Sequence, residues 1–261
     1  MLSYQHAFHA GNPADLHKHI VFAELLSLLT KKDRGITVME THSGRGLYDL
    51  TSAEAQKTGE AADGVGRLSL DPDTPHGAAI STIRARHGET AYPGSPLIAS
   101  HFLRPQDRQL LMELHPAEGP ALKHNMKGTI AEIHQRDGYE GVLAIAPPTP
   151  RKGLVLIDPS YEVKTEYDDV AAFVPKLMKK WPEASVLIWY PILTAGRHEA
   201  MIGALSALPL VRHEVRFHYK EGKGMLGSGL ILVNPPYGSE ACFDAALRQA
   251  GNLLTENSVS R

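Results

Sequence analysis

Short apolar segments alternate with helix-like segments along most of this chain, and this alternation restricts the possible folds more than any single motif does. Leu154 to Ile157 form a continuous apolar run, which is typical of a strand covered on both faces in a parallel sheet. The sequence therefore predicts a doubly wound α/β fold. We expect strands near residues 36–41, 109–114, 129–135, 153–158, 185–190, 211–218 and 228–234, and helices near residues 14–31, 95–103, 116–127, 138–145, 166–181, 194–207 and 239–254.

The last two predicted strands depart from this alternation, because only the residues from Tyr219 to Gly227 join them. So short a connection cannot contain a crossover helix, and the two strands are therefore predicted to pair antiparallel. The expected result is a mostly parallel seven-stranded sheet that ends in an antiparallel hairpin. Such a sheet resembles the class I fold of S-adenosylmethionine-dependent methyltransferases, which is Rossmann-like.

The length of 261 residues fits a single α/β domain over residues 1–261 that carries an insertion. Between Tyr48 and Tyr92 there is no aromatic residue, and small and charged residues predominate. Because such a segment adds little to a core, we expect residues 48–92 to be an inserted helical subdomain. A long solvated loop is the alternative. The polar tail from Thr255 to Arg261 is predicted to fray.

Composition restricts the class of protein further. The 27 Lys and Arg residues and 29 Asp and Glu residues give a net charge of -2, so that contact with a nucleic acid would require a local basic patch. The single cysteine, Cys242, excludes an intramolecular disulfide and a cysteine-based zinc site. The sequence contains neither a signal-peptide core nor an apolar run long enough to span a bilayer. We therefore expect a soluble, cytoplasmic protein, monomeric and without a membrane partner.

The motif Asp158-Pro159-Ser160-Tyr161 directly follows the apolar run. Open parallel sheets bind ligands at the carboxyl ends of their strands, where Asp158 would lie. A carboxylate, a rigid proline and an aromatic ring at that point could hold a flat, weakly reactive base by its exocyclic amino group. The alternative is an ordinary turn, since Asp and Pro commonly form turns.

Other predicted strand ends carry groups that suit a nucleotide-like cofactor. A Gly-x-Gly sequence starts at Gly44 and allows close approach of a ligand to the backbone, although His42 stands where nucleotide-binding loops often have an earlier glycine. Glu113 could accept both hydroxyl protons of a ribose, and Asp137 could accept an amino proton of a purine. Each acid alone is typical of a helix cap or a solvated strand end. Their joint placement with Asp158 favours one composite site.

The segment from Tyr4 to His19 contains four histidines and one lysine. A metal site is not favoured, because His17 and His19 would point roughly 200° apart on a helix and no H-E-x-x-H pattern follows. We expect this segment to cover the ligand pocket, with Lys18 or His19 meeting the carboxylate of an amino-acid-bearing cofactor. For any single histidine, a satisfied position at a helix start is the alternative.

Taken in order, these segments resemble the bacterial large-subunit ribosomal RNA adenine-N6 methyltransferases of the RlmJ type, nearly from end to end. The resemblance rests on residues Leu2 to Tyr4, His9 to Asn12, Lys18 and His19, Thr41 to Gly46, Tyr92 to Leu97, Glu113 to Pro116, Asp137 and Gly138, Asp158 to Tyr161, and Asn234 to Pro236. It implies S-adenosylmethionine contacts at His19, His42, Ser95, Glu113, Asp137 and Gly138, Asp158 as the catalytic acceptor, Tyr4 as an RNA contact, and a helical insertion after the first strand.

The sequence departs from the family at one position, because the second proline of Asp-Pro-Pro-Tyr is Ser160 here. Ser160 loosens the backbone, which that proline would have restricted. Asn234-Pro235-Pro236-Tyr237 fits the adenine-methylase pattern better than residues 158–161 do. If strand 228–234 runs antiparallel, however, its carboxyl end lies opposite the cofactor, and we therefore assign the catalytic role to Asp158.

The predicted chemistry has Asp158 and the carbonyl group of Pro159 each accepting one N–H of adenine N6, with Tyr161 stacked on the base. For Tyr161, a core aromatic is the alternative. The adenine must be unpaired or leave its helix to reach such a pocket. Candidate contacts to the flanking RNA, each of which could instead be solvated surface, are Tyr4, Arg45, the pair Arg84 and Arg86, Arg151 with Lys152, and the loop from Lys220 to Lys223.

Two competing functions remain. The first is a DNA adenine methyltransferase, or a protein used in the utilisation of external DNA, for which the pocket chemistry would be the same. The second is a nucleic-acid-binding protein without catalysis, which Ser160 and the mild net charge make conceivable. Methylation of ribosomal RNA against duplex DNA distinguishes the first, and cofactor binding distinguishes the second.

Overall fold

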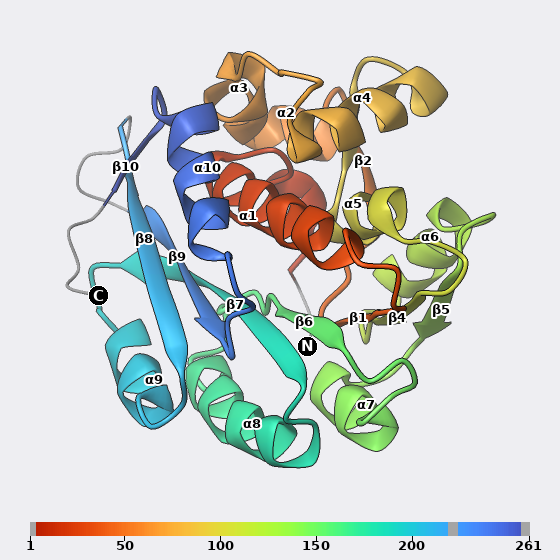
Figure 1. Cartoon of the computed structure of the whole chain (residues 1–261). Coiled ribbons are helices and arrows are strands. Elements are labelled where there is room, and N and C mark those ends of the chain that lie inside the picture. The colour runs from red at the N-terminus through yellow and green to blue at the C-terminus, as the bar shows by residue number, and fades with distance from the viewer. Residues whose placement is uncertain (1–3, 219–223, 257–261) are drawn as a thin grey trace.

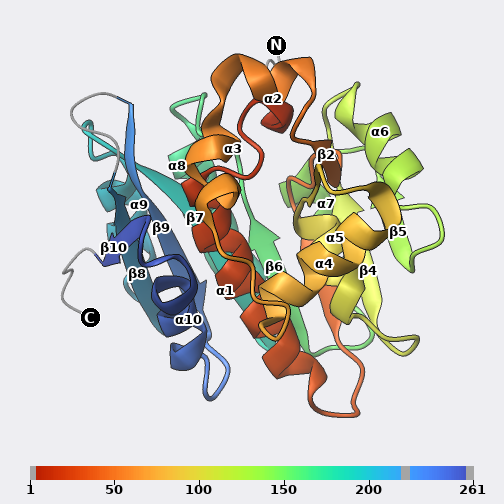
Figure 2. The same cartoon turned by 90° about the horizontal axis from the view of Figure 1, so that it is seen from above.

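The computed structural model describes residues 4–218 and 224–256, and within them eight strands form one central sheet (Figures 1 and 2). The strand order is β10-β8-β9-β7-β6-β1-β4-β5. Strands β5, β4, β1, β6 and β7 pair in parallel, whereas β9 runs antiparallel to both β7 and β8. The strands are β1 Thr37–Glu40, β4 Arg108–Met112, β5 Ala131–His134, β6 Gly153–Ile157, β7 Ala184–Leu193, β8 Leu210–Phe217, β9 Met225–Val233 and β10 Leu254–Glu256.

All seven predicted strands are present, and the predicted antiparallel pairing of the last two is confirmed by β8 and β9. This mixed sheet has the class I methyltransferase topology. The short edge strand β10 was not expected, and the prediction of a fraying tail is wrong at Thr255 and Glu256, which pair with β8. Leu254 is buried and anchors this strand; residues 257–261 lie outside the described part of the chain.

Helices cover both faces of the sheet, as the continuous apolar strands require (Figure 1). Leu154 and Leu156 of β6 belong to the apolar layer on one face, and Val155 and Ile157 to the layer on the other. The first face is covered by α1 (Pro13–Thr30), α5 (Ser95–Phe102) and α10 (Glu240–Ala250), and the second by α7 (Gly138–Ile145), α8 (Glu166–Lys180) and α9 (His198–Leu205). Every one of these helices is too short or too polar to cross a bilayer, as are the others in the described ranges.

Helix α1 is buried almost all round, because the sheet lies beneath it and other helices pack along its sides. Asn12 begins the helix, its side chain accepting a hydrogen bond from the Asp15 amide, and Pro13 occupies the first turn. Since 14 of its residues are buried, polar side chains such as Lys18 must find partners inside the protein.

The segment after β1 forms a two-stranded antiparallel ribbon, β2 (Leu47–Asp49) with β3 (Ala91–Pro93). Between the two strands lie α2 (Ala53–Thr58), α3 (Glu60–Asp63), the 3₁₀ helix η2 (Val65–Arg67) and α4 (Pro75–His87). Helix α4 packs on α1 and α5. We propose residues 48–92 as the extent of an inserted helical subdomain. Helix α6 (Glu118–Asn125) and the N-terminal 3₁₀ helix η1 (His6–Phe8) complete the elements that surround the candidate site.

Candidate active site

Four acidic residues lie at the carboxyl ends of four neighbouring parallel strands. Glu40 is the last residue of β1, Glu113 follows β4, Asp137 follows the end of β5, and Asp158 follows β6. The strands are adjacent in the order β5-β4-β1-β6, so their carboxyl ends share one edge of the sheet, where open α/β sheets bind ligands. The structure thus brings together the three acids expected from the sequence and adds Glu40.

Asp158 forms an ion pair with Lys18 of α1, in which Nζ donates to Oδ2 at 2.6 Å. The same ammonium group lies 2.9 Å from Oδ1 of Asp15. Burial alone would lower the pKa of Lys18, but the two carboxylates raise it well above its usual value. Lys18 is therefore a permanent cation held between two acids, and its expected contact with the carboxylate of a cofactor stays a prediction.

Asp15 is the centre of a buried polar cluster on the helix start. It accepts hydrogen bonds from the Gly11 amide at 2.9 Å and from His6 Nε2 at 2.8 Å, in addition to its ion pair with Lys18. Burial raises the pKa of Asp15, but His6 and Lys18 outweigh it and hold that pKa well below the usual range. The hydroxyl group of Tyr4 bonds to the other nitrogen of His6 at 2.8 Å, which connects Tyr4 to the Asp15–Lys18–Asp158 network.

Glu40 is fully buried at the end of β1, where its Oε2 accepts a hydrogen bond from Ser95 Oγ at 2.5 Å. Its second oxygen, Oε1, is buried without a hydrogen-bond partner within the described ranges. Burial raises the pKa of Glu40 to about 8, although the bond from Ser95 opposes the shift. A buried acceptor without a donor carries an energetic cost, which a cationic ligand group could remove.

The loop after β1 is fixed to the end of β4. The Gly44 amide donates to Glu113 Oε2 at 2.7 Å, and the His115 amide donates to Oε1 at 2.7 Å. Burial raises the pKa of Glu113, and the two amide bonds partly oppose this. Gly44 adopts a positive φ of 60°, which suits a residue without a side chain. Glu113 retains lone pairs for further donors, since each oxygen can accept two hydrogen bonds.

Asp137 caps α7, its Oδ1 accepting from the Glu140 amide at 2.9 Å. The capping interpretation and the ligand interpretation are compatible, because capping uses only one carboxylate oxygen. The next residue, Gly138, approaches the chain after β1 so closely that a Cβ atom there would lie 2.0 Å from the Thr41 carbonyl oxygen. His42 packs edge-on against Tyr139, with ring centroids 5.3 Å apart, and burial lowers the pKa of His42 to about 4.

The four N-terminal histidines have different hydrogen-bond partners and do not gather around one site, although His6 and His19 both face Asp15. His6 bonds to Asp15, His9 to Glu60, His17 to Ser228 and His213, and His19 to the Tyr92 hydroxyl group. Another group, His198, Glu199 and Glu214, has potential metal-ligand atoms within 4.8 Å of one another. Arg212 pairs with both carboxylates of that group at 2.6 Å, so that their charge is already neutralised in part.

Tyr161 points into the core rather than into open space. It is 7% exposed, its ring lies 4.4 Å from that of Tyr167, and its hydroxyl group donates to the Trp189 carbonyl oxygen at 2.8 Å. Its φ of 56° is positive, a rare conformation for a residue with a side chain. Within the described part of the chain, Ser160 makes two long hydrogen bonds, at 3.3 Å to Glu166 and 3.4 Å from the Glu162 amide.

Asn234 lies at the opposite edge of the sheet from Asp158, as the antiparallel direction of β9 predicts. Its side-chain amide donates to the carbonyl oxygens of Pro182 and Ala184 at 3.1 and 2.8 Å, at the amino end of β7. The Asn-Pro-Pro-Tyr motif is thus remote from the other candidate site residues, and Asn234 has a structural role in holding β9 to β7.

No role was predicted from the sequence for Glu40, Asp15 or Trp189. An acid that closes an apolar strand immediately before a Gly-x-Gly loop could have indicated Glu40. Asp15 and Trp189 carried no local signal, because Asp15 resembles an ordinary first-turn acid and Trp189 lies in a buried strand. In the structure Trp189 is half-buried, with Lys18 Nζ 5.6 Å from its ring centroid.

Comparison with known proteins gives consistent matches. A family model described as "Ribosomal RNA large subunit methyltransferase D, RlmJ" matches residues 33–260. "Ribosomal RNA large subunit methyltransferase J" of Haemophilus influenzae is 39% identical over 248 residues, which cover 91% of this chain and 88% of that protein. The Escherichia coli protein of the same name is 38% identical with the same coverage. A crystal structure of a Legionella pneumophila protein, 31% identical, superposes with a TM-score of 0.84 over 95% of this chain and 97% of that one.

Proposed function

The chain belongs to the RlmJ family of ribosomal RNA large subunit methyltransferases, and on this basis we propose that it transfers a methyl group from S-adenosylmethionine to N6 of an adenine in 23S ribosomal RNA. The observation that carries the proposal is the position of Asp158-Pro159, at the carboxyl end of β6 and beside three further strand-end acids. We further propose a cytoplasmic monomer that acts on protein-free large-subunit RNA.

The residues present fit S-adenosylmethionine, which membership of a methyltransferase family implies. The amino-acid end of this cofactor carries an ammonium group and a carboxylate. Glu40 Oε1 is a buried acceptor without a donor among residues 4–218 and 224–256, and this oxygen would suit the ammonium group. Its carboxylate would require a donor such as Lys18 or His19. Glu113 and Asp137, with the close backbone approach at Gly44 and Gly138, would suit the ribose and the adenine. Ser95 would act by orienting Glu40, to which it donates.

S-adenosylmethionine, when bound, would supply an electrophilic methyl group on a positively charged sulfur atom. Adenine N6 is a weak nucleophile because its lone pair is delocalised into the ring. Asp158 and the Pro159 carbonyl oxygen would each accept one N–H bond, favouring a pyramidal nitrogen and stabilising the positive charge that grows on it during the attack. Correct alignment of the reacting atoms can contribute about 7–11 kcal/mol. The surplus proton on N6 would then pass to Asp158 or to water.

Lys18 determines which oxygen of Asp158 is available to the substrate. Its ammonium group bonds to Oδ2 of Asp158, so that the other carboxylate oxygen is the acceptor available to N6. The ammonium group also opposes the growth of positive charge on the amine, and its ion pair with Asp15 at 2.9 Å offsets part of this effect. We propose that Lys18 would also hold the cofactor's carboxylate, which would offset the rest of its charge. Tyr4, joined to this network through His6, would contact the RNA, and Tyr161 would contact the base through its small exposed portion.

The test is a methylation assay with labelled S-adenosylmethionine on protein-free 23S ribosomal RNA and on duplex DNA. Labelling of RNA, with mass-spectrometric detection of N6-methyladenine, is the expected result. Labelling of DNA alone would favour the first alternative function, a DNA adenine methyltransferase. Calorimetry with S-adenosylmethionine tests the second: absence of binding at millimolar cofactor would favour a nucleic-acid-binding protein without catalysis.

A further inference from the structure

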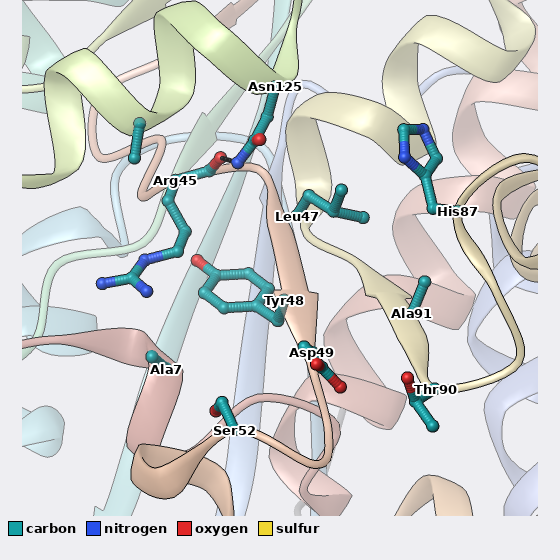
Figure 3. Close-up of a pocket in the computed structure, with 11 residues that line it drawn as sticks. Ala7, Arg45, Leu47, Tyr48, Asp49, Ser52, His87, Thr90, Ala91 and Asn125 are labelled. Carbon is teal, nitrogen blue, oxygen red and sulfur yellow. Dashed lines mark hydrogen bonds between the residues drawn. The ribbon is translucent and has the colours of Figure 1, made fainter.

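A cavity of about 370 Å³ opens between the β2–β3 ribbon, the C-terminal ends of α4 and α6, and the 3₁₀ helix η1 (Figure 3). This volume falls within the range of small-molecule sites, about 300–1,000 Å³. None of the residues assigned above to the cofactor or to catalysis lines it. Among the residues that do are Arg45, Leu47, Tyr48, His87, Thr90 and Asn125.

The cavity is joined to the candidate active site by a short series of contacts. Tyr48, in its wall, lies edge-on to the ring of His6 with centroids 5.2 Å apart. His6 bonds to Asp15, which pairs with Lys18, which pairs with Asp158. In addition, Arg45 follows Gly44 directly in the loop that bonds to Glu113. An RNA strand that runs from the base pocket at Asp158 toward the inserted residues 48–92 would therefore reach this cavity next.

The lining combines flat, apolar and hydrogen-bonding groups. The Arg45 guanidinium is held in a fixed plane by two bonds to Glu118, at 2.8 and 2.7 Å, and is 25% exposed. Guanidinium planes and aromatic rings are the surfaces on which unpaired RNA bases stack. Asn125 donates to the Arg45 carbonyl oxygen at 2.8 Å, as Figure 3 shows, which leaves its side-chain oxygen as an acceptor. The one carboxylate in the lining, Asp49, accepts locally from Thr51.

Basic side chains gather at the two helix ends that meet at the cavity. The last turn of α4 carries Arg84, Arg86 and His87, and the last turn of α6 carries Lys123 and His124. Such groups can neutralise the phosphates on either side of a bound nucleotide. Of the four basic clusters expected from the sequence, Arg45 lines the cavity, and the Arg84–Arg86 pair lies in the same helical turn as His87, which also lines it.

The other two clusters do not compete for this role. Arg151 and Lys152 precede β6 and so lie at its amino end, the edge of the sheet opposite Asp158, where Arg151 pairs with Glu183 at 2.9 Å. The loop from Lys220 to Lys223 lies outside the described residues. Arg151 and Lys152 therefore provide a control for effects of positive charge that do not depend on position.

We propose that this cavity binds the base of an unpaired ribonucleotide adjacent to the target adenine, with the cations at the ends of α4 and α6 holding its phosphates. The proposal rests on the RNA methyltransferase function proposed above and extends it to the flanking sequence. The cavity then anchors the RNA strand while the target base occupies the pocket at Asp158.

The substitution Ala121→Phe tests the proposal, because Ala121 of α6 lines the cavity and is half-buried. The larger side chain would fill the space proposed for the base. We expect the KM for ribosomal RNA to rise about tenfold, which is the typical effect of removing one stacked base, with kcat at saturating RNA and the Kd for S-adenosylmethionine within about twofold of wild type. An unchanged cofactor Kd also shows that the variant is folded.

A second variant, Arg86→Ala/His87→Ala, tests the phosphate-binding role of the α4 end. It should raise the KM for RNA and make log KM less steeply dependent on log salt concentration, by about one unit for each phosphate that is no longer neutralised. The matched control Arg151→Ala/Lys152→Ala should change neither quantity. A wild-type KM in Ala121→Phe, or equal effects of the two double variants, would overturn the proposal. If the wild-type protein itself does not methylate ribosomal RNA, that result contradicts the proposed function and not the proposed nucleotide-binding cavity.

Discussion

Lys18 and Asp158 are 140 positions apart in the sequence, yet the ammonium nitrogen of one lies 2.6 Å from a carboxylate oxygen of the other. The pair joins α1 to the carboxyl end of β6, and Asp15 lies on the other side of the same cation, 2.9 Å away. All three groups are largely buried, so their charges are compensated mainly inside the protein, where His6 is a further partner of Asp15. The position of α1 on the sheet therefore controls the position of the proposed catalytic carboxylate.

Lys18→Met is expected to lower the free energy of unfolding by about 3–5 kcal/mol, because it leaves two buried carboxylates without their shared cation. Urea unfolding measures this directly. The double variant Asp15→Asn/Lys18→Met should recover part of the stability, since one of the unpaired charges is then removed as well. A single variant as stable as wild type would show that the ion pair does not form in solution.

Asp158→Asn should lower kcat on ribosomal RNA by about 10²–10³, the usual effect of removing one group that stabilises transition-state charge. Asn234→Ala is the matched comparison, because its motif resembles an adenine-methylase site but lies at the other edge of the sheet. It should lower the free energy of unfolding by about 1–3 kcal/mol by removing the hydrogen bonds to Pro182 and Ala184, and keep kcat within about twofold. Abolished activity in Asn234→Ala alone would reverse the assignment.

The strands and the strand-end acids could be predicted from the sequence because their signals are local. An apolar run such as Leu154 to Ile157 indicates a buried strand, and the parallel order of β5, β4, β1 and β6 then brings Glu113, Asp137 and Asp158 to one edge. The direction of β9 followed from the short connection to β8, and it was sufficient to separate Asn234 from the site.

The contacts across the site could not be predicted, since no spacing rule relates Lys18 to Asp158. The same is true of Tyr161, whose inward orientation depends on Tyr167 and on a carbonyl group in β7. The burial of Glu40 depends on how α5 packs, because Ser95 donates to it. Strand β10 has three residues and forms only because β8 offers it an edge.

Buried histidines should make the fold sensitive to acid. Burial lowers the pKa of both His42 and His76 to about 4, whereas an imidazole in the unfolded chain has a pKa of about 6.5. Below pH 6.5 the unfolded chain therefore binds protons that the folded protein does not, and stability falls as the pH decreases toward 4. Each residue would contribute up to roughly 3 kcal/mol to this decrease.

His76→Leu tests this prediction at one position. Both ring nitrogens of His76 are buried without a hydrogen-bond partner among the residues that the structure describes, so the apolar side chain should cost no stability at pH 7.5. The free energy of unfolding, measured in urea between pH 7.5 and 4.5, should fall less steeply in the variant. His87→Leu, at an exposed position of the same helix, should follow the wild-type curve. Parallel curves for His76→Leu and wild type would contradict the prediction.

Tyr161 should act through its ring and not through its hydroxyl group, because that hydroxyl group is directed to the Trp189 carbonyl oxygen. Tyr161→Phe is expected to keep kcat/KM for RNA within about threefold, since it removes one neutral hydrogen bond in a supporting position. Tyr161→Ala should lower kcat/KM at least about tenfold, since it removes the aromatic surface beside Asp158. It also opens a cavity against Tyr167, so that activity must be expressed per folded enzyme, with S-adenosylmethionine binding as the measure of folded sites. A decrease in Tyr161→Phe as large as that in Tyr161→Ala would instead show that the hydroxyl group leaves Trp189 and takes part in binding the base.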